Sequence, residues 1–309
     1  MKKHATLRFL SIITALVSYL MLLMGAIVTK TGSGKGCGNS WPICKGELIP
    51  ESMPLESIIE YSHRIISSGA GMLILALTIW SWIVYRDNFR VKLFGVMSVF
   101  FVLLQGALGA LTVMFEGPFI KKFMLALHFG FSLISFASVM LLVIQLYRLR
   151  DGKPDKCSGT PLSRGFVWSV WALATYTYIA VYSGALVRHM EATMGCGYDF
   201  PSCGVTKFPG FGSTAEIHML HRYAGILLFL LTLWLLVVVL RKYRDNRDFV
   251  QGSWIAMILI TLQAIAGIIT VKTGGVLMAA LLHTTIITIY FTTITYLCML
   301  AGAPWKKKG

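Results

Sequence analysis

The sequence predicts an all-α integral membrane protein of eight transmembrane helices, arranged as two tandem four-helix bundles related by pseudo-two-fold symmetry. Three observations predict this fold: the composition, a series of eight long apolar segments, and an internal duplication. Of the 309 residues, 56% are hydrophobic and only 13% are charged, whereas soluble domains carry about 25% charged residues. A soluble globular enzyme, a disordered chain and a small disulfide scaffold are therefore excluded.

Each apolar segment is long enough to cross a lipid bilayer as a helix, which takes about 20 residues. Uninterrupted apolar runs of this length favour a helical bundle over a β-barrel, whose strands alternate over about 10 residues. We expect the eight spans at 8–29, 58–84, 93–115, 123–147, 165–187, 216–240, 252–271 and 276–301.

The basic residues predict the orientation of these spans. The formal net charge is +15, but the lysines and arginines form short clusters between apolar runs, which argues against nucleic-acid binding. The loops of one face hold 8 of the 28 basic residues, two more lie within spans, and 18 lie at the termini and in the loops of the other face. Because cytoplasmic loops are enriched in Lys and Arg, we expect a multi-pass cell-membrane protein with both termini in the cytoplasm. The first span is expected to be retained, because it is long for a signal peptide and no small-residue cleavage site follows it.

Short motifs recur in the same order along the chain, at offsets of 155 to 159 residues. Such self-similarity predicts two halves, 1–150 and 151–309, each of four helices in the same orientation, as parallel repeats about an axis along the membrane normal. The matching pairs are Gly25-Ala26 with Gly184-Ala185, Gly36-Cys37-Gly38 with Gly195-Cys196-Gly197, His63-Arg64 with His221-Arg222, Gln105 and Gly109 with Gln263 and Gly267, and His128 with His283.

Four histidines lie at similar depth in the even-numbered spans, His63 and His128 in the first half and His221 and His283 in the second. Each is about 10 Å inside the outer boundary, at 1.5 Å per residue. A lone intramembrane histidine is often a hydrogen-bond partner between helices. Two depth-matched pairs related by duplication instead favour ligation of a metal cofactor between facing helices. Few carboxylates or thiols lie nearby, which favours a haem with two axial histidines over zinc or a di-iron centre.

Three charged residues lie inside the apolar spans. Arg64 and Arg222 each follow a ligand histidine, and two interpretations stay open for them: counter-charges for haem propionates or side chains that extend to the outer interface. Glu60 precedes His63 by one helical turn, but His218 stands at the duplicated position. This asymmetry is typical of an enzyme with one catalytic half and one electron-transfer half, in which Glu60 accepts a proton or polarises water. The alternative is a carboxylate favoured by the helix dipole.

The cysteines form two C-x6-C pairs in predicted outer loops, where disulfides persist. We expect the disulfides Cys37–Cys44 and Cys196–Cys203, with zinc binding as the alternative. The remaining two, Cys157 and Cys298, are expected to be unpaired.

These motifs together resemble haem A synthases of the Bacillus type, over essentially the whole chain. The segments that carry the resemblance are Gly32-Ser33-Gly34-Lys35-Gly36-Cys37-Gly38, Trp41-Pro42 with Cys44, Ile59-Glu60-Tyr61-Ser62-His63-Arg64, Leu127-His128-Phe129-Gly130, Gly184-Ala185, Val187-Arg188-His189, His221-Arg222 and His283.

The resemblance implies an enzyme that oxidises a methyl group of haem O to a formyl group by successive hydroxylations, giving haem A for terminal oxidases. It implies that His63 and His128 ligate the substrate haem beside the catalytic carboxylate Glu60, and that His221 and His283 hold a haem b cofactor. Haem O synthase and a terminal oxidase or its assembly factors are the implied partners, and a homo-oligomer is left open. The main alternative is a di-haem b-type quinol or electron-transfer cytochrome, and a second is a haem or small-molecule transporter.

Overall fold

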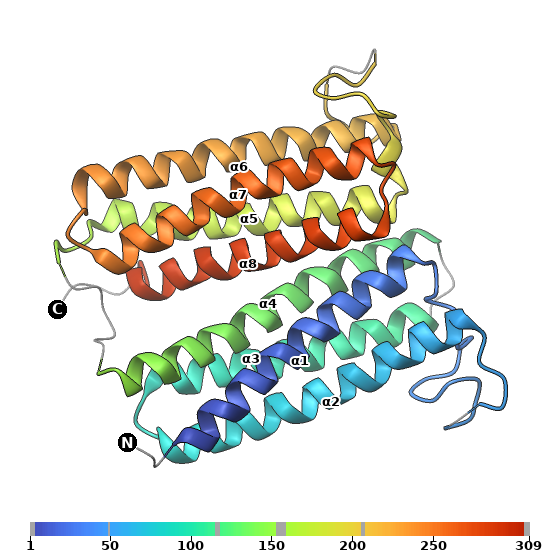
Figure 1. The fold of residues 1–309 in the computed structure, drawn as a ribbon, viewed down its shortest axis with the longest axis horizontal. Helices are drawn as coiled ribbons and strands as arrows, with labels where there is room; N and C mark the ends of the chain where they lie inside the picture. Colours follow the sequence, from blue (N-terminus) through green and yellow to red (C-terminus); the bar gives the residue numbers. More distant parts are fainter. Residues whose placement is uncertain (1–3, 49, 115–117, 153–158, 205–207, 306–309) are drawn as a thin grey trace. The chain divides into compact units, whose positions relative to one another are not determined.

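The chain folds entirely into helices, as the sequence predicts. A computed structural model describes residues 4–48, 50–114, 118–152, 159–204 and 208–305 (Figure 1). The long helices are α1 (Ala5–Lys30), α2 (Leu55–Val84), α3 (Phe89–Met114), α4 (Pro118–Arg150), α5 (Arg164–His189), α6 (Thr214–Lys242), α7 (Arg247–Lys272) and α8 (Leu277–Ala301). All eight are long and apolar enough to cross a membrane, which confirms the predicted fold class.

The helices extend beyond the predicted spans at most ends. For example, α2 begins at Leu55 where the span was expected to begin at residue 58, and α4 runs from Pro118 to Arg150 where 123–147 was expected. Hydropathy detects only the part of a helix that suits the hydrocarbon core, whereas the backbone hydrogen bonds continue into more polar sequence at the ends. Two of the helices begin at a serine cap: Ser163 Oγ accepts from Phe166 N at the start of α5, and Ser213 Oγ accepts from Glu216 N at the start of α6.

The structure forms two compact units, Met1–Asp151 (unit 1) and Gly152–Gly309 (unit 2). In unit 1, α1 contacts α2, α2 contacts α3, α3 contacts α4, and α4 returns to α1. In unit 2, α5 to α8 follow the same closed order, and Figure 1 shows the four helices of each unit running alongside one another. Each unit is therefore an up-and-down four-helix bundle.

The pattern of buried and exposed side chains in each unit is typical of a helical bundle in a membrane. Small polar residues line the inner face of α1, where Ser11, Thr14 and Ser18 are fully buried, and such residues let neighbouring helices approach closely. Large apolar side chains instead point outward, as with Met72 and Leu103, which are 69% and 67% exposed. A lipid environment accounts for this outward apolar surface.

One loop at the same end of each unit lies against the next helix. The disulfide loops are residues 31–54, between α1 and α2, and residues 190–213, between α5 and α6; we call this end of each unit its disulfide end. A Cβ atom on Gly36 would lie 2.6 Å from Ser57 N, and one on Gly195 would lie 2.9 Å from Ala215 N. Only glycine permits such an approach between loop backbone and helix backbone.

The opposite end of unit 2 is joined by polar contacts between the segment before α5 and the turn between α6 and α7. Thr160 donates to Asp245 Oδ2 from both its backbone nitrogen and its hydroxyl, and Asn246 Nδ2 donates to the Thr160 carbonyl. The hydrogen bond from the Thr160 hydroxyl holds the pKa of Asp245 below its ordinary value.

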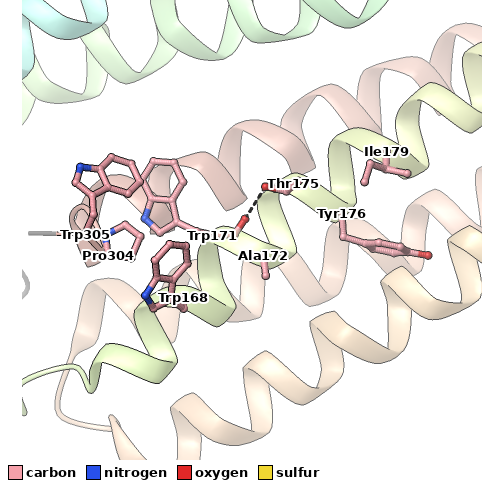
Figure 2. A pocket seen from close by; sticks show the side chains of 8 residues that line it. All are labelled: Trp168, Trp171, Ala172, Thr175, Tyr176, Ile179, Pro304 and Trp305. Carbon is pink, nitrogen blue, oxygen red and sulfur yellow. Dashed lines mark hydrogen bonds between the residues drawn. The ribbon is translucent and has the colours of Figure 1, made fainter.

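An aromatic groove of about 420 Å³ lies on α5 in unit 2, close to this same end (Figure 2). Trp171 Nε1 donates to the Gly302 carbonyl, and the Trp171 ring lies 5.6 Å from that of Trp305. Tryptophans near the ends of transmembrane helices are typical of the interface between membrane and water. The groove is lined by Trp168, Trp171, Ala172, Thr175, Tyr176, Ile179, Pro304 and Trp305.

The contact of Gly36 with α2 gives a test of the loop geometry. We expect Gly36→Ala to destabilise unit 1 by about 1–3 kcal/mol, because the added methyl group overlaps helix backbone that cannot move aside. Thermal unfolding of the purified protein in detergent measures this change. Gly34→Ala is the matched control, since its Cβ would meet only a Val28 methyl carbon at 3.8 Å. Equal midpoints for the two variants would contradict the tight approach.

Candidate functional site

The two histidines of unit 1 lie on α2 and α4. His128 Nδ1 is 2.8 Å from the Gln105 carbonyl oxygen. A carbonyl only accepts, so Nδ1 carries the proton and the lone pair lies on Nε2. His63 Nδ1 makes a longer contact of 3.5 Å with the Ser67 hydroxyl, which donates to the His63 carbonyl.

The two histidines of unit 2 lie on α6 and α8, with ring centres 6.4 Å apart. His221 Nδ1 lies 2.9 Å from the Ser183 hydroxyl, whose hydrogen is donated to the Ala180 carbonyl. His221 is therefore the donor to Ser183, and its Nε2 keeps the lone pair. His283 Nε2 lies 3.0 Å from the side-chain nitrogen of Gln263, which only donates, so this Nε2 is also unprotonated.

Each histidine ring packs against a glycine on the preceding helix. A Cβ added to the glycine would lie 3.2 Å from His63 Cε1 at Gly25, 3.3 Å from His128 Cε1 at Gly109, 2.9 Å from His221 Cε1 at Gly184 and 3.2 Å from His283 Cε1 at Gly267. These glycines recur in the repeat, and the structure identifies the side chain that packs against each of them. A larger residue at any of them would displace the ring.

The donor set fits a haem iron better than a metal held by several side chains. Within the described residues, no group of three or more His, Cys, Asp or Glu side chains is gathered at one point. A pair of imidazoles suits an iron whose other four ligands come from a porphyrin. Two metal–nitrogen bonds of about 2 Å, plus the distance from each ring nitrogen to its ring centre, give a separation of about 6 Å between ring centres. The 6.4 Å between His221 and His283 agrees with this value.

Glu60 is buried at the disulfide end of unit 1, with 4% of its surface exposed. Its Oε2 accepts a hydrogen bond of 2.8 Å from the backbone nitrogen of Cys37, and its Oε1 forms an ion pair of 2.5 Å with Arg64. Both carboxylate oxygens are thus fixed, one turn from His63. The disulfide loop and the carboxylate are directly linked, which the sequence alone did not indicate.

Arg64 and Arg222 hold the disulfide loops through equivalent backbone carbonyls. Arg64 Nη1 donates to the carbonyls of Ser40 and Ile43 at 2.7 and 2.8 Å. Arg222 donates to those of Asp199 and Ser202, at 2.8 and 2.7 Å, which occupy the same positions in the repeat. Neither arginine simply extends into solvent: each joins its helix to its loop.

The loops contain the two disulfides that the cysteine spacing predicts. Cys37–Cys44 and Cys196–Cys203 are both bonded, which excludes these pairs as zinc ligands. Cys298 is a free, buried thiol, as expected. Cys157 lies outside the described residues.

Unit 2 has no carboxylate at the position of Glu60. His218 stands there, 5% exposed, with a hydrogen bond to the backbone of Ala192 and no partner among the described residues for its Nδ1. Arg222 correspondingly makes its described hydrogen bonds to carbonyl groups alone. The two units therefore share a histidine pair, a glycine contact for each ring and an arginine-held loop, but differ in the charge beside the histidines.

Sequence reasoning missed the partners of the histidines. Ser183, Gln105 and Gln263 were not proposed as site residues, although both glutamines recur in the repeat. The signal that could have found the glycine contacts is that Gly25 and Gly109 recur in the second half at offsets of 159 and 158 residues, close to those of the histidines.

Fold and site together define a polytopic helical membrane protein with a histidine pair in each of two four-helix units. Residues 8–295 match the COX15-CtaA family, described as cytochrome oxidase assembly protein, and the chain belongs to this family. This confirms the family that the sequence motifs indicate.

Relatives of similar length carry the name heme A synthase. The protein of Alkalihalophilus pseudofirmus is 40% identical, with 97% of this chain and 99% of the relative covered. That of Halalkalibacterium halodurans is 39% identical over 96% and 97%, and that of Bacillus mycoides is 40% identical over 95% and 93%.

The arginine contacts predict how the first disulfide responds to reductant. We expect Arg64→Ala to speed reduction and alkylation of Cys37 and Cys44 roughly tenfold or more, because charge-assisted hydrogen bonds that hold the loop are lost. Mass spectrometry after timed reduction and maleimide labelling measures the rate. Arg164→Ala, at the exposed first residue of α5, is the control and should leave the rate unchanged. An unchanged rate in Arg64→Ala would show that the loop is held by other contacts.

Proposed function

We propose that this protein is a haem A synthase, which converts haem O to haem A by oxidising a porphyrin methyl group to a formyl group through successive hydroxylations. The observation that carries the proposal is the asymmetry between two otherwise matching histidine sites. Glu60, fixed by Cys37 N and Arg64, stands beside the histidine pair of unit 1, and His218 replaces it in unit 2. Membership of the COX15-CtaA family and the names of the relatives support the same function.

The asymmetry assigns different tasks to the halves, which we take to be parallel repeats. Residues 1–150 bind the substrate haem, with His63 and His128 as its axial ligands. Residues 151–309 bind a haem b cofactor between His221 and His283, which supplies electron transfer when bound. The unprotonated Nε2 atoms of His128 and His221 and the 6.4 Å separation of the second pair support these assignments.

Glu60 acts in this scheme as the proton acceptor beside the substrate. Burial keeps water from competing for the carboxylate, and the backbone nitrogen of Cys37 and the guanidinium of Arg64 fix its orientation. Arg64 is thereby neutralised within the site. Arg222 is hydrogen-bonded to carbonyl groups in the part of the chain that the structure describes, and it offers a counter-charge to a haem propionate.

The excess of basic residues at the termini and in three of the loops supports a cell-membrane orientation with both termini in the cytoplasm. The disulfide ends then face outward, where the two disulfides are stable. Haem O synthase supplies the substrate, and a terminal oxidase or its assembly factors receive the product.

The function is tested by haem analysis of the protein expressed with and without a supply of haem O. We expect haem A and a hydroxylated intermediate only when haem O is supplied, and haem b under both conditions. Extracted haems are identified by chromatography and mass spectrometry. Haem b alone under both conditions would support an electron-transfer cytochrome instead.

The same assay compares the effect of substituting Glu60 with that of substituting Glu56, the other carboxylate of α2. Glu60→Gln should abolish haem A while haem b stays bound, whereas Glu56→Gln, which changes an exposed residue one turn earlier, should retain haem A formation. Full activity in Glu60→Gln would contradict a catalytic carboxylate.

The glycine contacts test the assignment of haem b to unit 2. We expect Gly184→Ala to lower bound haem b on the order of tenfold, because the added methyl group displaces His221, and losses of 10- to 100-fold are usual when the support of a metal ligand is removed. The absorption spectrum of the purified protein measures occupancy. Gly225→Ala lies on the same unit with open space around its Cβ and should keep full occupancy. Normal haem b in Gly184→Ala would overturn the assignment.

A further inference from the structure

Two buried glutamines lie beside the histidine pairs, at equivalent positions of the repeat. Gln105 on α3 is 4% exposed and Gln263 on α7 is 8% exposed. The side-chain oxygen Oε1 of each has no hydrogen-bond partner within the described part of the chain. A buried amide oxygen without a partner costs about 1–3 kcal/mol, so a hydrogen-bond donor on a bound molecule would stabilise each of these atoms.

The two amides are held in different places. Gln263 Nε2 lies 3.0 Å from Nε2 of His283 and donates a hydrogen bond to it. Gln105 Nε2 instead lies 3.4 Å from Sδ of Met21 on α1, and only the Gln105 backbone carbonyl contacts His128. The position of Met21 is occupied in the second half by Ala180, which offers no sulfur atom.

This difference directs the Gln105 amide away from its histidine. Met21 is buried, with 3% exposed, and the contact with its sulfur turns the amide toward α1. A thioether is a weak acceptor, so the amide of Gln105 is under-satisfied at both its oxygen and its nitrogen. The amide therefore remains available to a polar group carried by a ligand bound at His63 and His128.

We propose that Gln105 Oε1 accepts a hydrogen bond from the hydroxyl group of the hydroxylated intermediate and so retains it in unit 1 for the second oxidation. The inference rests on the proposed function. The methyl group of the substrate has no polar atom to donate, whereas the alcohol that replaces it carries an O–H donor. A buried acceptor then distinguishes the two porphyrins by a hydrogen bond that only the alcohol can form. Gln105 is thus a residue that contacts the intermediate, and Met21 is a positioning residue that acts through it.

The test compares binding of two porphyrins by the purified full-length protein. Haem O and its hydroxymethyl derivative are titrated separately, and the ratio of their dissociation constants is taken from the absorption change. We expect the native protein to prefer the alcohol, Gln105→Leu to reduce that preference roughly tenfold with haem O affinity little changed, and Met21→Leu to reduce it partially. In cells supplied with haem O, Gln105→Leu should release the hydroxylated intermediate into the membrane lipid.

Gly106→Ala is the matched control, because it changes the neighbouring residue of α3, where an added Cβ meets open space, and should leave the ratio unchanged. Gln105→Glu keeps an acceptor oxygen and should retain much of the preference. If Gln105→Leu loses its haem b spectrum and is misfolded, Gln105→Glu is used for the test instead. An unchanged ratio in a Gln105→Leu protein with a normal haem b spectrum would overturn the inference. Equal loss of affinity for both porphyrins would also overturn it, since that result indicates a general packing defect.

The outcome is separable from failure of the proposed function. A native protein that makes no haem A when haem O is supplied contradicts the function itself. If the native protein makes haem A but the Gln105→Leu protein has an unchanged binding ratio, only the role of Gln105 is contradicted.

Discussion

Contact between a glycine on one helix and an imidazole ring on the next determines how each four-helix unit is built around its histidines. Helices in a membrane gain little from the hydrophobic effect and associate through close packing at small residues. Gly25, Gly109, Gly184 and Gly267 provide that packing, and each admits one histidine ring. The spacing between helices and the position of each ring are therefore set by the same four contacts.

A second set of contacts joins the helices to the disulfide loops. Arg64 and Arg222 donate hydrogen bonds to carbonyl groups of the loops that lie outside regular secondary structure. Gly36 and Gly195 let each loop lie directly on a helix. The loop in unit 1 also donates a backbone hydrogen bond to Glu60. The same loop is closed by Cys37–Cys44, so one residue, Cys37, both forms the disulfide and donates the hydrogen bond that orients the carboxylate.

The duplicated framework carries different chemistry in its two copies. Glu60 is replaced by His218 and Met21 by Ala180, whereas the paired histidines, their glycines and the arginines are retained. Two substitutions thus change the charge and the amide orientation beside a histidine pair without altering the packing that holds it. Such separation between framework and chemistry allows one half to act on a porphyrin and the other to hold one as a cofactor, in the function proposed for this protein.

The sequence by itself determined the all-helical membrane fold, the eight spans, the duplication, the four histidines and the cysteine pairs. Hydrocarbon accepts only long apolar segments with internally bonded backbone, so hydropathy and spacing are sufficient signals for these features. Only the tertiary structure decided that the Gln105 carbonyl accepts a hydrogen bond from His128, that the Ser183 hydroxyl accepts one from His221, and that Cys37 N donates one to Glu60. These partners lie more than 20 residues apart in the chain, and the packing of helices against one another, which no local pattern encodes, brings them together.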